Sequence, residues 1–169
     1  RRHLRYGGKV FGICGGFQML GDAVEDMDGL EGDIGTTTGL GLLNMTTRMV
    51  AGKQLRQVSG QFIEEAVGAT RLVAFTGYEM HNGVTRGDAL ASPMATLGGR
   101  PDGAVSEDGQ VIGTYVHGIF DEPAACDAIL RWAGLAAGGQ SVDYQQHRLQ
   151  QLDRLADQVE QHLDTAWLK

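Results

Sequence analysis

The stretch KVFGICGGFQMLG, residues Lys9 to Gly21, decides how the rest of the chain is interpreted. It begins with the apolar run Lys9–Ile13, which is short and bounded by glycines, as is typical of a buried strand. Cys14 follows, and the residues after it have the apolar spacing of a helix. The order strand, sharp turn, helix is that of a nucleophile elbow, with cysteine in the position of serine. We therefore expect the turn to present Cys14.

The glycines around Cys14 have a physical reason in this interpretation. Side chains at Gly12 and Gly16, two residues to either side, would collide on a strained turn, and glycine avoids that collision. A helix N-terminus aimed at the sulfur favours thiolate over thiol. The backbone N–H of Gly15 is in position to donate to an oxyanion. The alternative is a cysteine that only fills a small apolar space, and the elbow alone does not decide between the two.

The composition limits the class of protein. The 169 residues are 42% hydrophobic, which is enough for one domain, 1–169, with a core. A net charge of −7 disfavours nucleic acid as a partner. Two distant cysteines indicate neither a disulfide framework nor a zinc site, and they favour a reducing cytoplasm. The sequence has no apolar run long enough for a membrane span, and RRHLRYGG leads into no signal-peptide core.

The pattern along the chain predicts a mixture of strands and helices, and therefore an α/β domain. The expected elements are a helix at Phe17–Asp26, a long loop at Met27–Gly41, strands at Met45–Val50, Gln54–Ile63 and Thr70–His81, a hairpin within Asp102–Phe120, and a helix from Pro123. Asp108-Gly109 is the expected hairpin turn.

A long amphipathic helix is expected at the C-terminal end, within residues 141–168. Asp143, with Gln146 three residues later, resembles a capping box at its start. We expect its apolar stripe to pack on the domain or on a neighbour; the stripe consists of Leu149, Leu152, Ala156, Val159, Leu163 and Ala166.

A cysteine nucleophile needs a base, and His117 is the best placed of five histidines. It ends a predicted strand in GTYVHGIF, and the carboxyl edge of a parallel α/β sheet is where sites form. The other histidines are expected at a frayed end or on the solvent side of the terminal helix, except for His81 in GYEMHNG. Glu79, His81 and His117 could gather a metal ion, but their spacing is not diagnostic and we expect no metal.

Five motifs then indicate a family. GICGGFQMLG, GLGLLN, GYEMHNG, GTYVHGIFD and LDRLAD occur in this order, and together they resemble the C-terminal glutaminase portion of the cobyric acid synthase family over almost the whole chain. That portion is a class I glutamine amidotransferase domain. The resemblance implies an open sheet with flanking helices.

The resemblance also implies a reaction. Cys14 would attack the carboxamide of glutamine, form a thioester and release ammonia, with His117 as the general acid and base. Gln18 matches a family glutamine that binds the substrate. The ammonia would serve ATP-dependent amidation of corrinoid carboxylates in cobalamin (vitamin B12) biosynthesis. These residues contain no nucleotide motif, so ATP and Mg are expected in a synthetase domain outside them.

The sequence departs from the family pattern of class I domains in two respects. His117-Gly118-Ile119 lacks the glutamate of His-x-Glu, so the orienting acid is unassigned; Glu79, Asp121 and an acid from a partner domain are the candidates. In addition, too few residues precede Cys14 to supply the loop with the second oxyanion donor. We therefore expect an N-terminally incomplete, C-terminal fragment of a longer synthetase that is weak or inactive alone, since one lost donor costs about 10²–10³ in rate.

Two further functions stay open from the sequence. One is a related amidotransferase that acts on a cell-wall lipid precursor. The other is a non-catalytic scaffold for a synthetase partner, in which Cys14→Ser would leave glutamine-dependent product formation unchanged. The sequence also leaves open whether Glu79 and His81 only form a turn packed near the site. Cys126 is expected to be a core residue of its helix.

Overall fold

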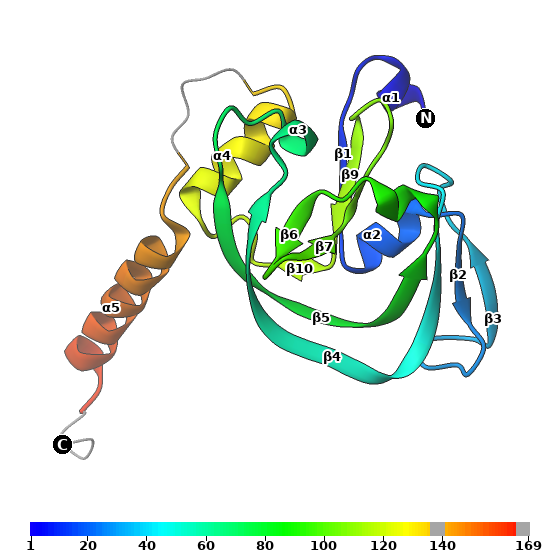
Figure 1. Ribbon diagram of the computed structural model, residues 1–169. Helices are drawn as coiled ribbons and strands as arrows, with labels where there is room; N and C mark the ends of the chain where they lie inside the picture. Colours follow the sequence, from blue (N-terminus) through cyan, green and yellow to red (C-terminus); the bar gives the residue numbers. More distant parts are fainter. Residues whose placement is uncertain (136–140, 165–169) are drawn as a thin grey trace.

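The structure is a computed structural model that describes residues 1–135 and 141–164. Figure 1 shows two sheets with helices packed around them and one long helix that projects away. The elements in chain order are α1 Arg2–Arg5, β1 Val10–Ile13, α2 Gly15–Leu20, β2 Ala23–Asp26, β3 Gly35–Thr38, β4 Thr46–Phe62, α3 Glu64–Val67, β5 Ala74–Arg86, the 3-10 helix η1 Asp88–Ala91, β6 Ala95–Leu97, β7 Arg100–Asp102, β8 Ala104–Val105, β9 Val111–Thr114, β10 Val116–His117, α4 Pro123–Trp132 and α5 Tyr144–His162.

The first sheet has three strands in the order β1-β9-β8. Strand β1 runs parallel to β9, with Ile13 opposite Thr114, and β8 runs antiparallel to β9. The turn between β8 and β9 carries the predicted Asp108-Gly109, with Gly109 at a φ of 63°. The Asp108 carboxylate accepts hydrogen bonds from the Ser106 hydroxyl and the Gln110 backbone, which close the turn. The predicted first strand and the predicted hairpin are both confirmed.

The second sheet has seven strands, with the path β10-β5-β4-β2-β3 and with β6 and β7 added beside β4. Its centre is the long antiparallel pair β4–β5, which curves beneath α2 (Figure 1). The two strands predicted at Met45–Val50 and Gln54–Ile63 are one strand, β4, with an irregularity in its pairing between Met49 and Gln54. The strand predicted from Thr70 begins later and extends to Arg86.

The prediction of one helix over Phe17–Asp26 is wrong in its second half. Helix α2 ends at Leu20, and Ala23–Asp26 is strand β2, between β3 and β4. Gly21 has an extended backbone, and a side chain there would meet the carbonyl of Met45 at 2.5 Å. The chain therefore leaves the helix where it meets β4, and strand pairing outweighs the helical spacing of the sequence.

The segment Met27–Gly41 is also less irregular than predicted. Residues Gly35–Thr38 form β3, which pairs antiparallel with β2. Between the two strands, the Asp26 carboxylate accepts hydrogen bonds from the amides of Leu30 and Glu31 at 2.8 and 2.9 Å. These bonds lower the pKa of Asp26.

The apolar core has two parts, one on each side of the first sheet's strands. One cluster joins α2 to β9 and includes Phe17, Leu20 and Val111. The other joins α4 to the second sheet, and α4 contributes its buried face of Ala125, Ala128 and Ile129. Helix α4 begins at Pro123 as predicted.

Helix α5 forms as predicted, but its apolar stripe is not covered. The Asp143 side chain accepts from the Gln146 amide at 2.9 Å, which confirms the predicted cap. No residue of α5 is buried, and Leu149 and Leu152 are more than half exposed. For the part of α5 that the structure describes, the stripe therefore does not pack on the domain, and its packing on a neighbour stays a prediction; Ala166 lies outside the described residues. No helix among these residues is long and apolar enough to cross a membrane.

Candidate functional site

The turn between β1 and α2 places Cys14 in a strained backbone conformation. Its φ of 53° and ψ of −114° are unusual for an L-residue, and it is the only non-glycine residue with positive φ in the part of the chain that the structure describes. The Cys14 amide donates to the Thr114 carbonyl at 2.9 Å, and its thiol donates to the Met80 carbonyl at 3.4 Å. Such strain is typical of a nucleophile elbow, as the sequence predicted.

Of the two glycines expected to avoid a collision at the Cys14 turn, only Gly12 does so. A Cβ at Gly12 would lie 2.7 Å from Leu20 and 2.8 Å from the Gly16 carbonyl, so the strand requires glycine there. A Cβ at Gly15 or Gly16 would have nothing within 4 Å. The predicted collision therefore exists at Gly12, where the helix backbone approaches, and not at Gly16. Gly15 begins α2 directly after the nucleophile, so its N–H follows Cys14 as the elbow requires.

His117 comes to the same region through the other sheet. It ends β10, directly opposite Tyr78 of β5. The two rings stack with centroids 5.0 Å apart and planes 7° from parallel. The Nε2 atom of His117 is buried and has no hydrogen-bond partner among the described residues.

Cys14 and His117 therefore converge on one short segment of β5. The Cys14 thiol contacts the carbonyl of Met80, and the His117 ring lies on Tyr78, two residues earlier in the strand. The convergence follows from the register of the first sheet, because β1 and β9 are parallel and the polypeptide leaves both strands at the same edge of that sheet. A thiol and an imidazole at this edge can form a nucleophile and its base.

Gln18 lies on the buried face of α2, one helical turn after Cys14. Its Nε2 atom donates to the Tyr115 hydroxyl at 3.4 Å. A Cβ on Gly83 of β5 would lie 2.5 Å from the same atom, so the amide is held closely against that strand. The amide thus lies between α2 and β5, close to the turn that carries Cys14.

Glu79 is placed away from His117. Consecutive residues of a strand point to opposite faces, and Glu79 follows Tyr78, on which His117 stacks. The Glu79 carboxylate is 2% exposed and is bound by Arg56 and by Arg100, with the Arg100 Nη2 at 3.0 Å. Burial raises the pKa of Glu79, but the hydrogen bonds and charges of the two arginines outweigh burial and lower the pKa overall.

Asp121, the other candidate orienting acid, lies four residues after His117. Its carboxylate accepts from the Gln145 side chain of α5 at 3.1 Å, and its amide donates to the Gly118 carbonyl at 2.9 Å. Among the described residues, neither Asp121 nor Glu79 has a hydrogen bond to His117. The structure thus places Cys14 and His117 against the same segment of β5, and among the described residues no acid is hydrogen-bonded to His117.

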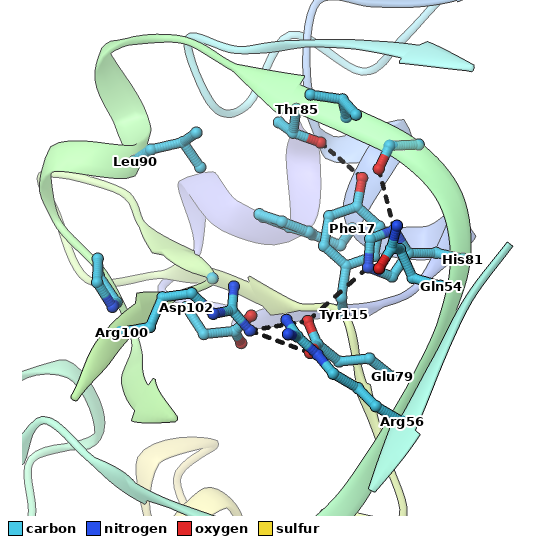
Figure 2. A pocket seen from close by; sticks show the side chains of 14 residues that line it. Phe17, Gln54, Arg56, Glu79, His81, Thr85, Leu90, Arg100, Asp102 and Tyr115 are labelled. Carbon is cyan, nitrogen blue, oxygen red and sulfur yellow. Dashed lines mark hydrogen bonds and ion pairs between the residues drawn. The ribbon is translucent and has the colours of Figure 1, made fainter. Parts of the chain in front are cut away.

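A cavity of about 380 Å³ lies on the Glu79 face of β5 (Figure 2). Figure 2 shows Arg56 and Arg100 directed at Glu79, with His81 and Tyr115 nearby. The His81 ring stacks on Tyr115 with centroids 3.8 Å apart, and its Nδ1 donates to the Gly83 carbonyl at 2.9 Å. Cys14 and His117 do not line this cavity, so it is separate from the nucleophile.

Asp102 also lines the cavity, and sequence reasoning missed it. Burial raises its pKa, while the Thr114 hydroxyl donates to it at 2.5 Å. Arg56, Arg100 and Tyr115 were missed as well. No local signal marks these residues, because Arg56 comes from β4, Arg100 and Asp102 come from β7, and Tyr115 lies between β9 and β10, so that only the folded sheet brings them together. In the described ranges, no group of three or more His, Cys, Asp or Glu side chains is placed to hold a metal ion.

Comparisons with known proteins agree with this geometry. A family model described as the CobB/CobQ-like glutamine amidotransferase domain matches residues 1–125. Among solved structures, the chain is similar to a chain of "Structure of PurLQS from Thermotoga maritima", with a TM-score of 0.53 and 16% sequence identity. That match covers 78% of this chain and 65% of the other, and at this identity it shows the fold alone. The expected α/β fold of open sheets with flanking helices is confirmed.

Proposed function

Because this chain belongs to the CobB/CobQ-like glutamine amidotransferase domain family, we propose that it hydrolyses glutamine at Cys14 and supplies the ammonia to a synthetase. The observation that carries the proposal is the strained turn at Cys14, which holds the thiol against the strand on which His117 stacks. Strain of this kind persists only where the surrounding structure enforces it, and it clusters at reactive residues.

The proposed reaction has two halves. His117 takes the proton of the Cys14 thiol, and the sulfur adds to the carboxamide carbon of glutamine to give a tetrahedral oxyanion. The N–H of Gly15 donates to that oxyanion. The oxyanion collapses, the C–N bond breaks, and His117 returns the proton to the leaving group, so that ammonia leaves and a glutamyl thioester remains.

In the second half, water hydrolyses the thioester. His117 removes a proton from the water as it attacks, and the same oxyanion site is used again. Breaking the C–S bond releases glutamate, and the proton returns to Cys14. Gln18 is proposed to bind the substrate glutamine, in keeping with its position one turn after Cys14 and its hydrogen bond to Tyr115.

The acceptor we propose is a corrinoid carboxylate, amidated with ATP and Mg bound outside these residues. Support comes from the order of the five sequence motifs and from the family name, which includes CobQ. The acceptor test uses the longer polypeptide with its synthetase domain, a corrinoid with free carboxylates, and glutamine labelled with ¹⁵N in its amide. Incorporation of ¹⁵N into the corrinoid supports this acceptor; incorporation into a cell-wall lipid precursor instead contradicts it.

Glutaminase chemistry is tested first by covalent labelling. Because the chain alone is expected to be weak or inactive, the longer polypeptide with its synthetase domain is incubated with a diazoketone analogue of glutamine. Peptide mapping follows, with Cys126 as the internal control thiol. Modification confined to Cys14, prevented by glutamine and accompanied by loss of ammonia release, is the expected result. If Cys14→Ser retains glutamine-dependent ammonia release, the proposal is wrong.

A further inference from the structure

We propose that Tyr78 positions the imidazole of His117. In this proposal the tyrosine ring orients the base, and the structure shows no acid among the described residues that does so. The inference rests on the proposed function, in which His117 exchanges protons with Cys14. Tyr78 does not touch the substrate in this scheme and is therefore a positioning residue. Its contribution would be to hold the ring in one orientation.

The geometry of the ring pair supports this role. The centroids of Tyr78 and His117 are 5.0 Å apart and the planes differ by 7°, so the rings form an offset parallel stack. Rotation about the last side-chain torsion of a histidine is intrinsically soft, and only neighbours limit it. Turning the imidazole out of this plane would drive its edge into the Tyr78 ring. The stack therefore restricts the direction in which the ring nitrogens point.

Tyr78 is itself held firmly by backbone pairing. It lies in β5 with Gln57 of β4 opposite on one side and His117 of β10 opposite on the other. Gly77 of β5 allows this close approach, because a Cβ there would collide with the His117 carbonyl. A central strand position is a more rigid support than a loop.

The other groups near His117 do not provide an alternative orienter. Glu79 points to the opposite face and is occupied by two arginines. Asp121 is bonded to Gln145. Nε2 of His117 has no partner among the described residues.

The experiment separates the ring from its hydroxyl group. Tyr78→Phe keeps the ring, Tyr78→Leu removes it, and Tyr144→Leu makes the same change at an exposed tyrosine on α5. In the longer polypeptide with its synthetase domain, we measure kcat and KM for glutamine hydrolysis, and the maximal rate of Cys14 labelling by the diazoketone. Tyr78→Phe and Tyr144→Leu should stay within about twofold of wild type. Tyr78→Leu should lower kcat and the maximal labelling rate about 10- to 100-fold, the effect of a misplaced reacting group, with KM nearly unchanged.

A spectroscopic readout tests the stack without turnover. The His117 ring protons, assigned by their loss in His117→Gln, should be shifted upfield by the ring current of residue 78 in wild type and Tyr78→Phe, but not in Tyr78→Leu. If Tyr78→Leu does not fold, Tyr78→Thr replaces it, because threonine suits a strand.

Failure of this inference and failure of the proposed function are distinguishable. Without glutaminase function, the wild-type longer polypeptide itself shows no labelling at Cys14 and no ammonia release. The inference about Tyr78 is overturned by wild-type kcat and labelling rate in the non-aromatic variant, or by a wild-type His117 that shows no upfield shift.

Discussion

At the scale of single residues, the backbone of Cys14 is the most informative feature of the chain. Its positive φ is an observation that spacing alone could only suggest, because glycine-rich turns also occur without strain. The sequence correctly indicated that a thiol would sit at this turn and that a histidine would end a nearby strand. The sequence could not indicate that His117 meets a tyrosine ring and no carboxylate, because that depends on which strands pair.

The strain at Cys14 leads to a prediction about stability. Cys14→Gly should have a free energy of unfolding about 1 kcal/mol higher than that of Cys14→Ala. The reason is that glycine adopts this φ and ψ without the cost of about 1–3 kcal/mol that other residues incur. Urea unfolding measures the difference. The matched control is the same pair at Cys126 in helix α4, where glycine should be the less stable of the two by about 1 kcal/mol. The same order of stability at both positions would contradict strain at Cys14.

Two buried carboxylates should affect stability with opposite dependence on pH. The pKa of Glu79 is lowered, so its stabilisation is present above its ordinary value of 4.5 and is lost as the pH falls through the folded value. Glu79→Gln should therefore lower the free energy of unfolding at pH 7 by about 1–3 kcal/mol, because it removes the partner of Arg56 and Arg100. In urea unfolding, this difference should shrink as the pH falls below about 4.5 and through the lowered pKa of Glu79; a constant difference would contradict the ion pairs as the cause.

Asp102 should behave in the opposite way. Burial raises the pKa of Asp102, so the folded state favours the protonated carboxyl group. The stabilisation that this protonation contributes is fully present below pH 3.8 and is lost as the pH rises through the raised pKa. Asp102→Asn should therefore be more stable than wild type at pH 7 and equal to it at low pH. Asparagine can still accept from Thr114. A variant that is less stable than wild type at pH 7 would show that the ionised carboxylate is needed.

At the scale of elements, local pattern was reliable where one turn or one face decided the outcome. The hairpin at Asp108-Gly109, the start of α4 at Pro123 and the cap of α5 at Asp143 were all correctly predicted. Pattern failed at β2, where residues with helical spacing form a strand, because pairing with β3 and β4 is non-local. It failed in the same way at β4, predicted as two strands.

The packing of β1 on α2 can be tested at its closest point. Gly12→Ala should destabilise the protein by about 1–3 kcal/mol, because the new methyl group would press on Leu20 and on the Gly16 carbonyl. Thermal or urea unfolding measures the loss. The matched control is Gly15→Ala, where a Cβ meets no atom within 4 Å; its free energy of unfolding should stay within about 0.5 kcal/mol. Equal effects of the two substitutions would mean that the strand and helix are less closely packed than the structure shows.

At the scale of the whole molecule, the described chain divides into a packed α/β body and an uncovered helix. The body buries both core clusters, while α5 buries none of its residues. Helices in proteins owe most of their stability to tertiary packing of an apolar face, and α5 lacks such packing. Amphipathic spacing predicted its apolar stripe, but spacing carries no information about what covers the stripe.

Hydrogen exchange should reveal this division. Amides of α5 should exchange with far less protection than those of the paired strands β4 and β5, because local opening of an uncovered helix exposes little apolar surface. Leu152→Gln should accordingly change the free energy of unfolding of the body by less than about 0.5 kcal/mol. Protection of α5 equal to that of β5 would contradict the prediction and would show that the helix is covered in solution.

The sequence by itself determined the features that depend on neighbours along the chain: the turn that presents Cys14, the strand end at His117, the hairpin, the helix caps and the family. These follow from steric limits at glycine and proline and from apolar periodicity, which act within a few residues. Only the tertiary structure decided that β2 is a strand, that Glu79 forms ion pairs with two arginines, and that the Tyr78 ring stacks on His117. The physical reason is that strand pairing and burial bring together residues far apart in sequence. A local sequence pattern does not specify which distant strand a segment will pair with.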